Sequence, residues 1–87
     1  IFKHSTRCSI SSMAKRNFEF SWDVIPEDTK LYFLDLIAYR EISTEVAHLF
    51  QVTHQSPQIL LIKAGDCVLE ASHSDISAEE VAEVIAA

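Results

Sequence analysis

The stretch Lys3-His4-Ser5-Thr6-Arg7-Cys8-Ser9-Ile10-Ser11-Ser12 decides how the chain is interpreted, because it joins a strand pattern to a helix pattern. Ile1 and Phe2, just before it, have the β-propensity of a short buried strand. The apolar residues that follow recur at the spacing of one helix face: Ile10, Met13, Ala14 and Phe18. The thiol of Cys8 therefore falls at a predicted junction of strand and helix.

A cysteine at the start of a helix is stabilised as a thiolate, since unpaired N–H groups and the positive end of the helix dipole favour an anion. Arg7, and His4 when protonated, would favour the thiolate further. The alternative is that Cys8 is a small buried hydrophobic residue, but its polar neighbours Thr6 and Ser9 argue against deep burial. We therefore expect Cys8 to be a nucleophile.

The spacing around Cys8 predicts monothiol chemistry. A dithiol oxidoreductase needs a second cysteine three positions later, and Ser11 occupies that position here. A Cys-x-x-Ser site can attack a disulfide and carry a mixed disulfide, but another thiol must release it. Cys67 lies in an alternating strand pattern and is either packed, incidental or a resolving thiol; the sequence leaves these alternatives open.

Composition limits the class of protein. The 87 residues, 48% of them hydrophobic, predict a single domain over 1–87, and a start at Ile1 inside a strand suggests that a preceding strand and helix are missing. No apolar run reaches the length of about 18 residues that a membrane span needs, and no secretory signal opens the chain. Two cysteines without such a signal indicate reduced thiols, so a cytoplasmic protein is expected.

Charge and histidine spacing exclude other partners. A net charge of −6 with scattered lysines and arginines disfavours nucleic acid and anionic membranes. The spacings His4 to Cys8 and His48 to His54 match no short zinc pattern, so no metal site is expected. The acidic residues near the C-terminus indicate a solvated helix face.

The rest of the chain alternates strand and helix patterns. The apolar run 31–36 predicts a central strand covered on both faces, and 17–30 reads as a connection with a few apolar anchors. A second helix that packs on the sheet is predicted by the spacing of Ile42, Val46, Leu49 and Phe50. Residues 58–63 and 67–71 predict a hairpin around the only glycine, and a capping box at 77–80 starts a final helix.

This order predicts an α/β, thioredoxin-like three-layer fold with a mixed sheet that lacks its N-terminal strand and helix. In that fold a cis proline begins the hairpin strand beside the active cysteine, and Ser56-Pro57 directly precedes the predicted hairpin strand. We therefore predict a cis Ser56-Pro57 bond, with Pro57 packed against Cys8.

The chain resembles the monothiol bacilliredoxin family, the YtxJ-like thioredoxin-fold proteins, across nearly its whole length. The resemblance rests on four blocks: His4-Ser5-Thr6-x-Cys8-x-Ile10-Ser11, Phe33-Leu34-Asp35-Leu36-Ile37 leading to Arg40, His54-Gln55-Ser56-Pro57-Gln58, and Ala71-Ser72-His73. The family usually has a proline directly after the cysteine, where this chain has Ser9. His73 matches a family position, but we assign it no role.

The resemblance implies reduction of mixed disulfides between client proteins and bacillithiol, a low-molecular-weight thiol. Cys8 would be the nucleophile, and Ser11 would donate a hydrogen bond to its thiolate. Substrate contacts would come from Thr6, Arg7, Ser9, Ile10, Ser56 and Pro57. Bacillithiol would be a co-substrate, and no bound cofactor is expected.

Two other functions use the same fold. Monothiol glutaredoxins bridge iron–sulfur clusters, but they have a glycine directly after the cysteine, where Ser9-Ile10 here carries two Cβ atoms that hinder close approach. The cluster-carrier alternative predicts a coloured protein after anaerobic reconstitution with iron and sulfide. A redox-silent adaptor would have an unreactive Cys8.

Overall fold

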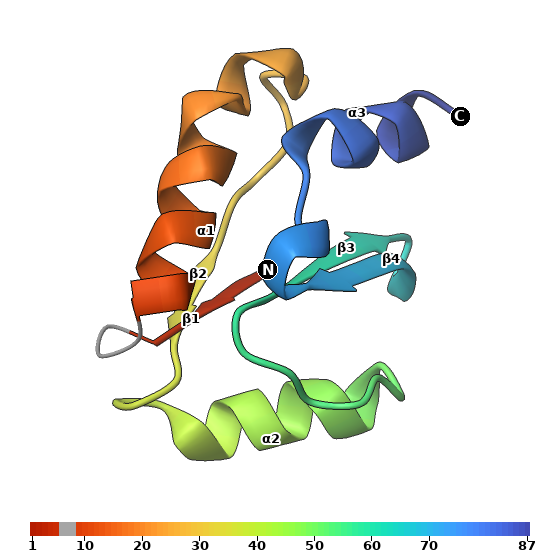
Figure 1. Ribbon diagram of the computed structural model, residues 1–87. Helices are drawn as coiled ribbons and strands as arrows, with labels where there is room; N and C mark the ends of the chain where they lie inside the picture. The colour runs from red at the N-terminus through yellow and green to blue at the C-terminus, as the bar shows by residue number, and fades with distance from the viewer. Residues whose placement is uncertain (6–8) are drawn as a thin grey trace.

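A mixed sheet of four strands forms the centre of the computed structural model, which describes residues 1–5 and 9–87 (Figure 1). The strands are β1 (Phe2–His4), β2 (Phe33–Asp35), β3 (Gln58–Lys63) and β4 (Asp66–Ser72), in the order β2-β1-β3-β4. β1 pairs parallel with β2 and antiparallel with β3, and β3 pairs antiparallel with β4. The predicted mixed sheet is confirmed.

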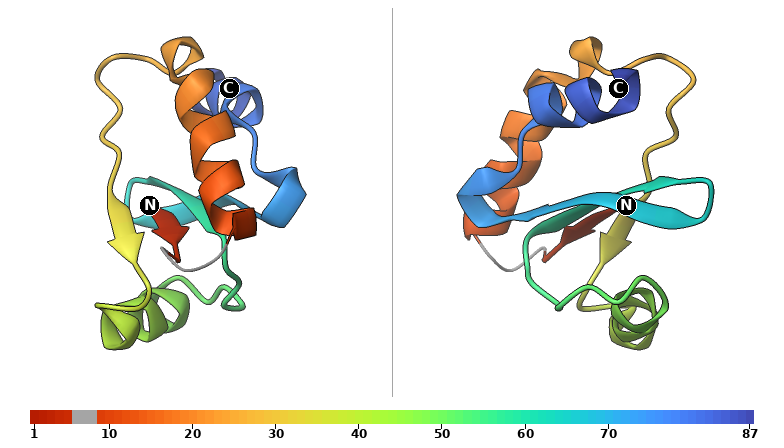
Figure 2. Two further views of the ribbon diagram at one scale, coloured as in Figure 1. Left: turned by 60° about the vertical axis from the view of Figure 1, so that its left-hand side comes forward. Right: turned by 90° about the vertical axis from the view of Figure 1, so that its right-hand side faces the viewer.

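Helices cover both faces of this sheet. They are α1 (Ser9–Phe20), α2 (Arg40–Leu49) and α3 (Ala78–Ala86). A short 3-10 helix η1 (Trp22–Val24) follows α1, and another, η2 (His73–Asp75), precedes α3. α1 and α3 lie on one face and α2 on the other, as the two turned views make clear (Figure 2). The arrangement has the three layers that the order of patterns predicted.

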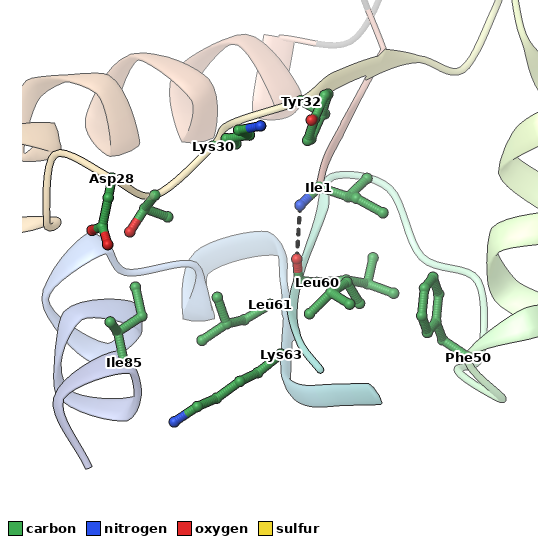
Figure 3. A pocket seen from close by; sticks show the side chains of 11 residues that line it. Ile1, Asp28, Lys30, Tyr32, Phe50, Leu60, Leu61, Lys63 and Ile85 are labelled. Carbon is green, nitrogen blue, oxygen red and sulfur yellow. Dashed lines mark hydrogen bonds between the residues drawn. The ribbon is translucent and has the colours of Figure 1, made fainter. Parts of the chain in front are cut away.

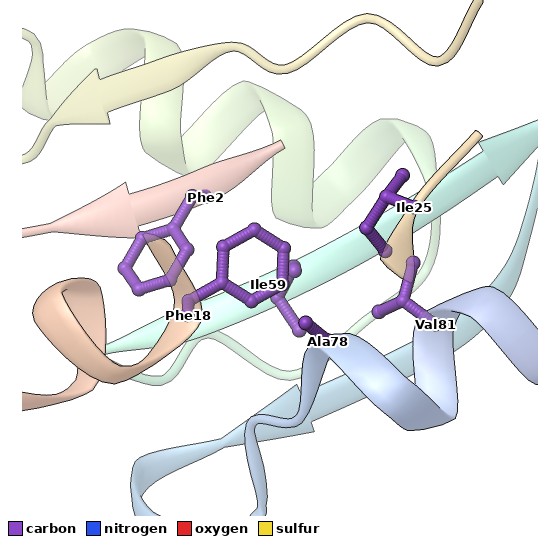
Figure 4. Close-up of a cluster of buried hydrophobic side chains, with 6 residues drawn as sticks. All are labelled: Phe2, Phe18, Ile25, Ile59, Ala78 and Val81. Carbon is purple, nitrogen blue, oxygen red and sulfur yellow. The ribbon is translucent and has the colours of Figure 1, made fainter. Parts of the chain in front are cut away.

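The core lies between the sheet and the layer of α1 and α3 (Figure 4). Its members are Phe2, Phe18, Ile25, Ile59, Ala78 and Val81. The Phe2 and Phe18 rings are tilted, with centroids 5.4 Å apart, and the Trp22 ring lies 5.7 Å from that of Phe18. This aromatic contact fixes α1 against β1, so the core holds together the two elements that flank Cys8 in the sequence.

The buried face of α1 agrees only in part with the predicted one. Phe18 is 2% exposed and Ala14 packs against the core, as predicted, but Ile10 and Met13 are 59% and 63% exposed. Ser11, seven residues before Phe18 and thus two turns away along the helix, is buried in their place. α1 also extends to Phe20, so the first residues of the expected connection are helical.

One further expectation is wrong, and another is confirmed only in part, since α2 forms as predicted but only Val46 and Phe50 of its predicted apolar face are half-buried. The apolar run 31–36 forms the three-residue strand β2 at one edge of the sheet, and Tyr32 and Phe33 are exposed. In α2, Ile42 and Leu49 are 50% and 75% exposed, whereas Ser43 is buried. The Ser43 carbonyl accepts a hydrogen bond from Lys3 Nζ at 3.2 Å, and Ser43 Oγ lies 3.4 Å from His54 Nδ1, so a polar side of α2 faces β1 and these two apolar side chains face outward.

The hairpin and the last helix agree with their predictions. β3 and β4 are joined by Ala64 and Gly65, which both have positive φ, as a two-residue type I′ turn requires. At the start of α3, the Ser77 hydroxyl accepts a hydrogen bond from the backbone N–H of Glu80 at 3.2 Å. This is the N-cap half of the predicted capping box.

Candidate functional site

The predicted nucleophile falls between two well-placed elements. β1 ends at His4, and α1 begins at Ser9. Thr6, Arg7 and Cys8 lie outside the described residues, and the predictions that concern them stay predictions.

Ser11 is buried and anchors the start of α1 to the end of β1. Its Oγ accepts a hydrogen bond from the backbone N–H of Ser5 at 3.0 Å and lies 2.8 Å from Nδ1 of His4. The hydrogen bond between Ser11 and His4 can run in two directions: either the Ser11 O–H donates to Nδ1, or Nδ1–H donates to Ser11 Oγ. Only in the second arrangement is the Ser11 O–H free to donate elsewhere. His4 is thus a site residue whose role the sequence did not reveal.

The first two residues of α1 are open to solvent. Ser9 and Ile10 are both exposed, with Ile10 at 59%. An apolar side chain in this position can contact a bound protein without rearrangement, which agrees with the substrate-binding role predicted for both residues. That role stays a prediction.

The Ser56-Pro57 peptide bond is cis, as predicted. Pro57 is buried, and its carbonyl oxygen accepts a hydrogen bond from the backbone N–H of His73 at 3.0 Å. The side chain of Gln58 donates from Nε2 to the Thr53 carbonyl at 3.0 Å and to the Glu70 carboxylate at 3.1 Å. These bonds tie the loop before Pro57 to the hairpin. The predicted contact between Pro57 and Cys8 lies outside the described residues.

A polar pocket of about 410 Å³ lies between the end of β1, the start of α2 and the loop before Pro57. Its lining is Ser5, Leu36, Ile37, Arg40, Ser43, Thr44, His54 and Ser56. The predicted site residue Ser56 therefore shares a cavity with Ser5, which precedes the segment containing Cys8. Arg40 and His54 belong to two separate blocks of the family resemblance, and the sequence has no indication that they line one pocket.

Beside this pocket lies a lysine with no exposed surface. Lys3 Nζ donates to the Ser43 carbonyl and to His54 Nδ1, both at 3.2 Å. Burial lowers the pKa of Lys3, and burial together with the nearby Lys3 charge lowers the pKa of His54. His54 is therefore neutral at pH 7, and because Nδ1 accepts from Lys3, its proton is on Nε2.

Cys67 lies on β4 and is half-buried, with its thiol donating to the Leu69 carbonyl at 3.3 Å. Burial raises the pKa of the Cys67 thiol, and the nearby Glu70 carboxylate raises it further. Less of Cys67 is therefore thiolate near neutrality than of a free cysteine.

We expect Cys67 to react with iodoacetamide more slowly than Cys8 at pH 7, since thiolate is the attacking form. Because the pKa of Cys67 is raised, its rate should level off at a higher pH than the rate of a free cysteine. Peptide mass spectrometry of samples quenched over a pH series measures both rates. Faster labelling of Cys67 than of Cys8 at pH 7 would contradict this order.

A larger, more apolar cavity of about 530 Å³ lies elsewhere, between β3, α3 and the segment before β2 (Figure 3). Ile1, Phe50 and Ile85 contribute to its walls, and the N-terminal amino group of Ile1 donates to the Leu60 carbonyl at 2.8 Å there. It contains none of the predicted site residues. Size alone does not identify the functional site of this molecule.

Residues 1–5 and 9–87 contain neither a cluster of metal ligands nor a membrane-spanning helix. Within these ranges, no three His, Cys, Asp or Glu side chains gather in a way that could hold a metal ion. No helix in the described part is long and apolar enough to cross a bilayer.

Comparison with known proteins gives the family and the fold of the chain. A family model described as "Monothiol bacilliredoxin BrxC" matches residues 1–81. A solved structure described as an oxidoreductase with a thioredoxin fold superposes with a TM-score of 0.82 at 30% identity, covering 97% of this chain and 73% of that chain. The predicted thioredoxin-like fold is confirmed.

Proposed function

Because the chain belongs to the monothiol bacilliredoxin family, we propose that this thiol oxidoreductase removes bacillithiol from modified proteins through Cys8. The observation that carries the proposal is the extent of the family match. It spans residues 1–81 and so includes Cys8, Ser11 and the cis Ser56-Pro57 bond in one continuous match.

The reaction is a thiol–disulfide exchange. The Cys8 thiolate attacks the bacillithiol sulfur of the mixed disulfide, so that a Cys8–bacillithiol bond forms as the client–bacillithiol bond breaks. The client sulfur leaves with the electron pair as a thiolate and takes a proton from water. A second low-molecular-weight thiol, as its thiolate, then attacks the bacillithiol sulfur of the adduct, so that a disulfide between the two small thiols forms and Cys8 leaves as a thiolate.

The network around Ser11 supports a role in controlling the thiolate. When His4 Nδ1–H donates to Ser11 Oγ, the Ser11 hydroxyl proton becomes free to donate to an anion. The Ser5 N–H holds the same oxygen in place, so the hydroxyl need not search for its position. We assign Ser11 as the donor to the Cys8 thiolate and His4 as the residue that orients that donor.

The segment before Pro57 supports binding of an extended ligand. Within the part of the chain that the structure describes, the backbone groups of Ser56 make no hydrogen bond with other backbone groups. Free backbone groups beside a strand can pair with an extended segment of a client, as in other modes of strand addition. The Gln58 side chain keeps this loop in position while the client binds.

The proposal is tested by incubating the protein with a bacillithiolated client and following the adduct by mass spectrometry. We expect the adduct mass to move from the client to the peptide containing Cys8. The matched variant is Cys67→Ser, in which this first transfer should be unchanged. An adduct that stays on the client, or moves only to Cys67, would refute the proposal.

The same experiment decides how the adduct is released. If an external thiol resolves it, Cys67→Ser turns over like the wild type once bacillithiol is added. Accumulation of adduct on Cys8 in Cys67→Ser would instead identify Cys67 as the resolving thiol.

A further inference from the structure

The polar pocket beside Ser56 has an unusual charge for this chain. The protein carries a net charge of −6, yet none of the residues that line the pocket is acidic. Arg40 is the charged residue of the lining, and it is exposed at the first position of α2. Among the described residues, no carboxylate forms an ion pair with the Arg40 guanidinium.

A second positive charge lies behind the pocket wall. Lys3 Nζ contacts Ser43 and His54, both of which line the pocket, and neither partner carries a negative charge. Every Asp and Glu of the chain is among the described residues, because positions 6–8 are Thr, Arg and Cys. None of these carboxylates forms an ion pair with Lys3 in the described part. A buried ammonium with no carboxylate partner among the described residues favours an anion beside it.

The other polar groups of the lining are suited to an oxygen anion. His54 carries its proton on Nε2 and is a neutral donor, while Ser5 and Ser56 add hydroxyl groups. An arginine binds a carboxylate through two parallel hydrogen bonds, which is the strongest arrangement of this kind. Ser5 precedes Cys8 by three residues and Ser56 precedes the cis proline, so the pocket borders both predicted parts of the reaction site.

We propose that this pocket binds a carboxylate group of the low-molecular-weight thiol that exchanges with Cys8, with Arg40 as the principal contact and Lys3 as a buried supporting charge. The inference rests on the proposed function, because it assumes that a small thiol is the second substrate. It adds that the thiol is selected by its negative charge. A neutral thiol of the same shape would lose the contact with Arg40 and exchange more slowly.

The test compares N-acetylcysteine with its neutral amide. Cys8 is first converted to a pyridyl disulfide in the Cys67→Ser background, and the release of thiopyridone by each thiol is followed at low ionic strength. Rates are divided by the thiolate concentration, so that the difference in thiol pKa is removed. The quantity compared is the rate with N-acetylcysteine divided by the rate with its amide. We expect Arg40→Gln to lower this ratio by about tenfold, the effect of one hydrogen bond to a charged group.

The matched control is Lys63→Gln, which removes the same charge from the far end of β3. Its rate ratio should equal that of the parent, and thermal unfolding should confirm that both variants are folded. An unchanged ratio in Arg40→Gln, or an equal fall in Lys63→Gln, would overturn the proposal. A lower ratio in Arg40→Gln supports the pocket even if the wild type accepts no bacillithiol from a client, which would refute only the proposed function.

Discussion

Replacement of Cys8 by serine is expected to abolish removal of bacillithiol from a client protein. A serine hydroxyl is not ionised near neutrality and cannot attack a disulfide, so the hydroxyl at position 8 does not replace the thiolate. The rate should fall to the uncatalysed background, a loss of at least about three orders of magnitude, as for other enzymes that lose their nucleophile. The measurement is release of the free client thiol over time. Continued release by Cys8→Ser above the background would exclude the monothiol mechanism.

Ser11→Ala is the graded comparison for this experiment. The loss of one hydrogen bond to a thiolate costs about 1.5–3 kcal/mol, so turnover should slow without stopping. The variant also leaves the Ser5 N–H and His4 Nδ1 without their partner, which should lower the free energy of unfolding by about 1–3 kcal/mol. The turnover rates of Cys8→Ser and Ser11→Ala should therefore be measured well below the unfolding temperature of Ser11→Ala.

Replacement of Phe18 by alanine is expected to destabilise the fold by about 3–5 kcal/mol. Phe18 is 2% exposed and contacts both the Phe2 and the Trp22 rings, so its removal leaves a cavity at the centre of the core. This loss is a large part of the roughly 5–15 kcal/mol that stabilises a typical domain. Urea unfolding followed by circular dichroism, with linear extrapolation to water, measures it.

Met13→Ala on the same helix is the matched control. Met13 is 63% exposed, and alanine has the highest helix propensity, so the free energy of unfolding should change by less than about 0.5 kcal/mol. A loss of stability in Met13→Ala as large as that in Phe18→Ala would show that the buried face of α1 is assigned incorrectly.

The contrast between these two residues explains where sequence reasoning succeeded and failed. The pattern of strands and helices and the turn at Gly65 follow from local signals such as β-propensity and turn chemistry, whereas the cis proline was predicted from the expected thioredoxin-like order. Periodicity alone placed Met13 in the core, because it counts apolar residues and gives no weight to a buried hydroxyl such as that of Ser11.

The pocket could not be predicted, because its groups come from distant parts of the chain. Lys3 bonds to Ser43, 40 residues away, and to His54, 51 residues away. A lysine between Phe2 and His4 gives no local indication that it is fully buried. Only the three-dimensional arrangement brings β1, α2 and the loop before Pro57 together around one amino group.

β1 joins the two sides of the molecule through neighbouring residues. His4 reaches Ser11 in the α1 layer, and Lys3, one position earlier, reaches Ser43 in the α2 layer on the opposite face. Because side chains alternate along a strand, a slip of one residue would exchange the imidazole and the ammonium between the layers. Any opening of this short strand would break the hydrogen bond between His4 and Ser11 and remove Lys3 from beside the pocket in a single event. A partly unfolded chain would then keep its thiol without the neighbours that we propose to give the thiol its selectivity.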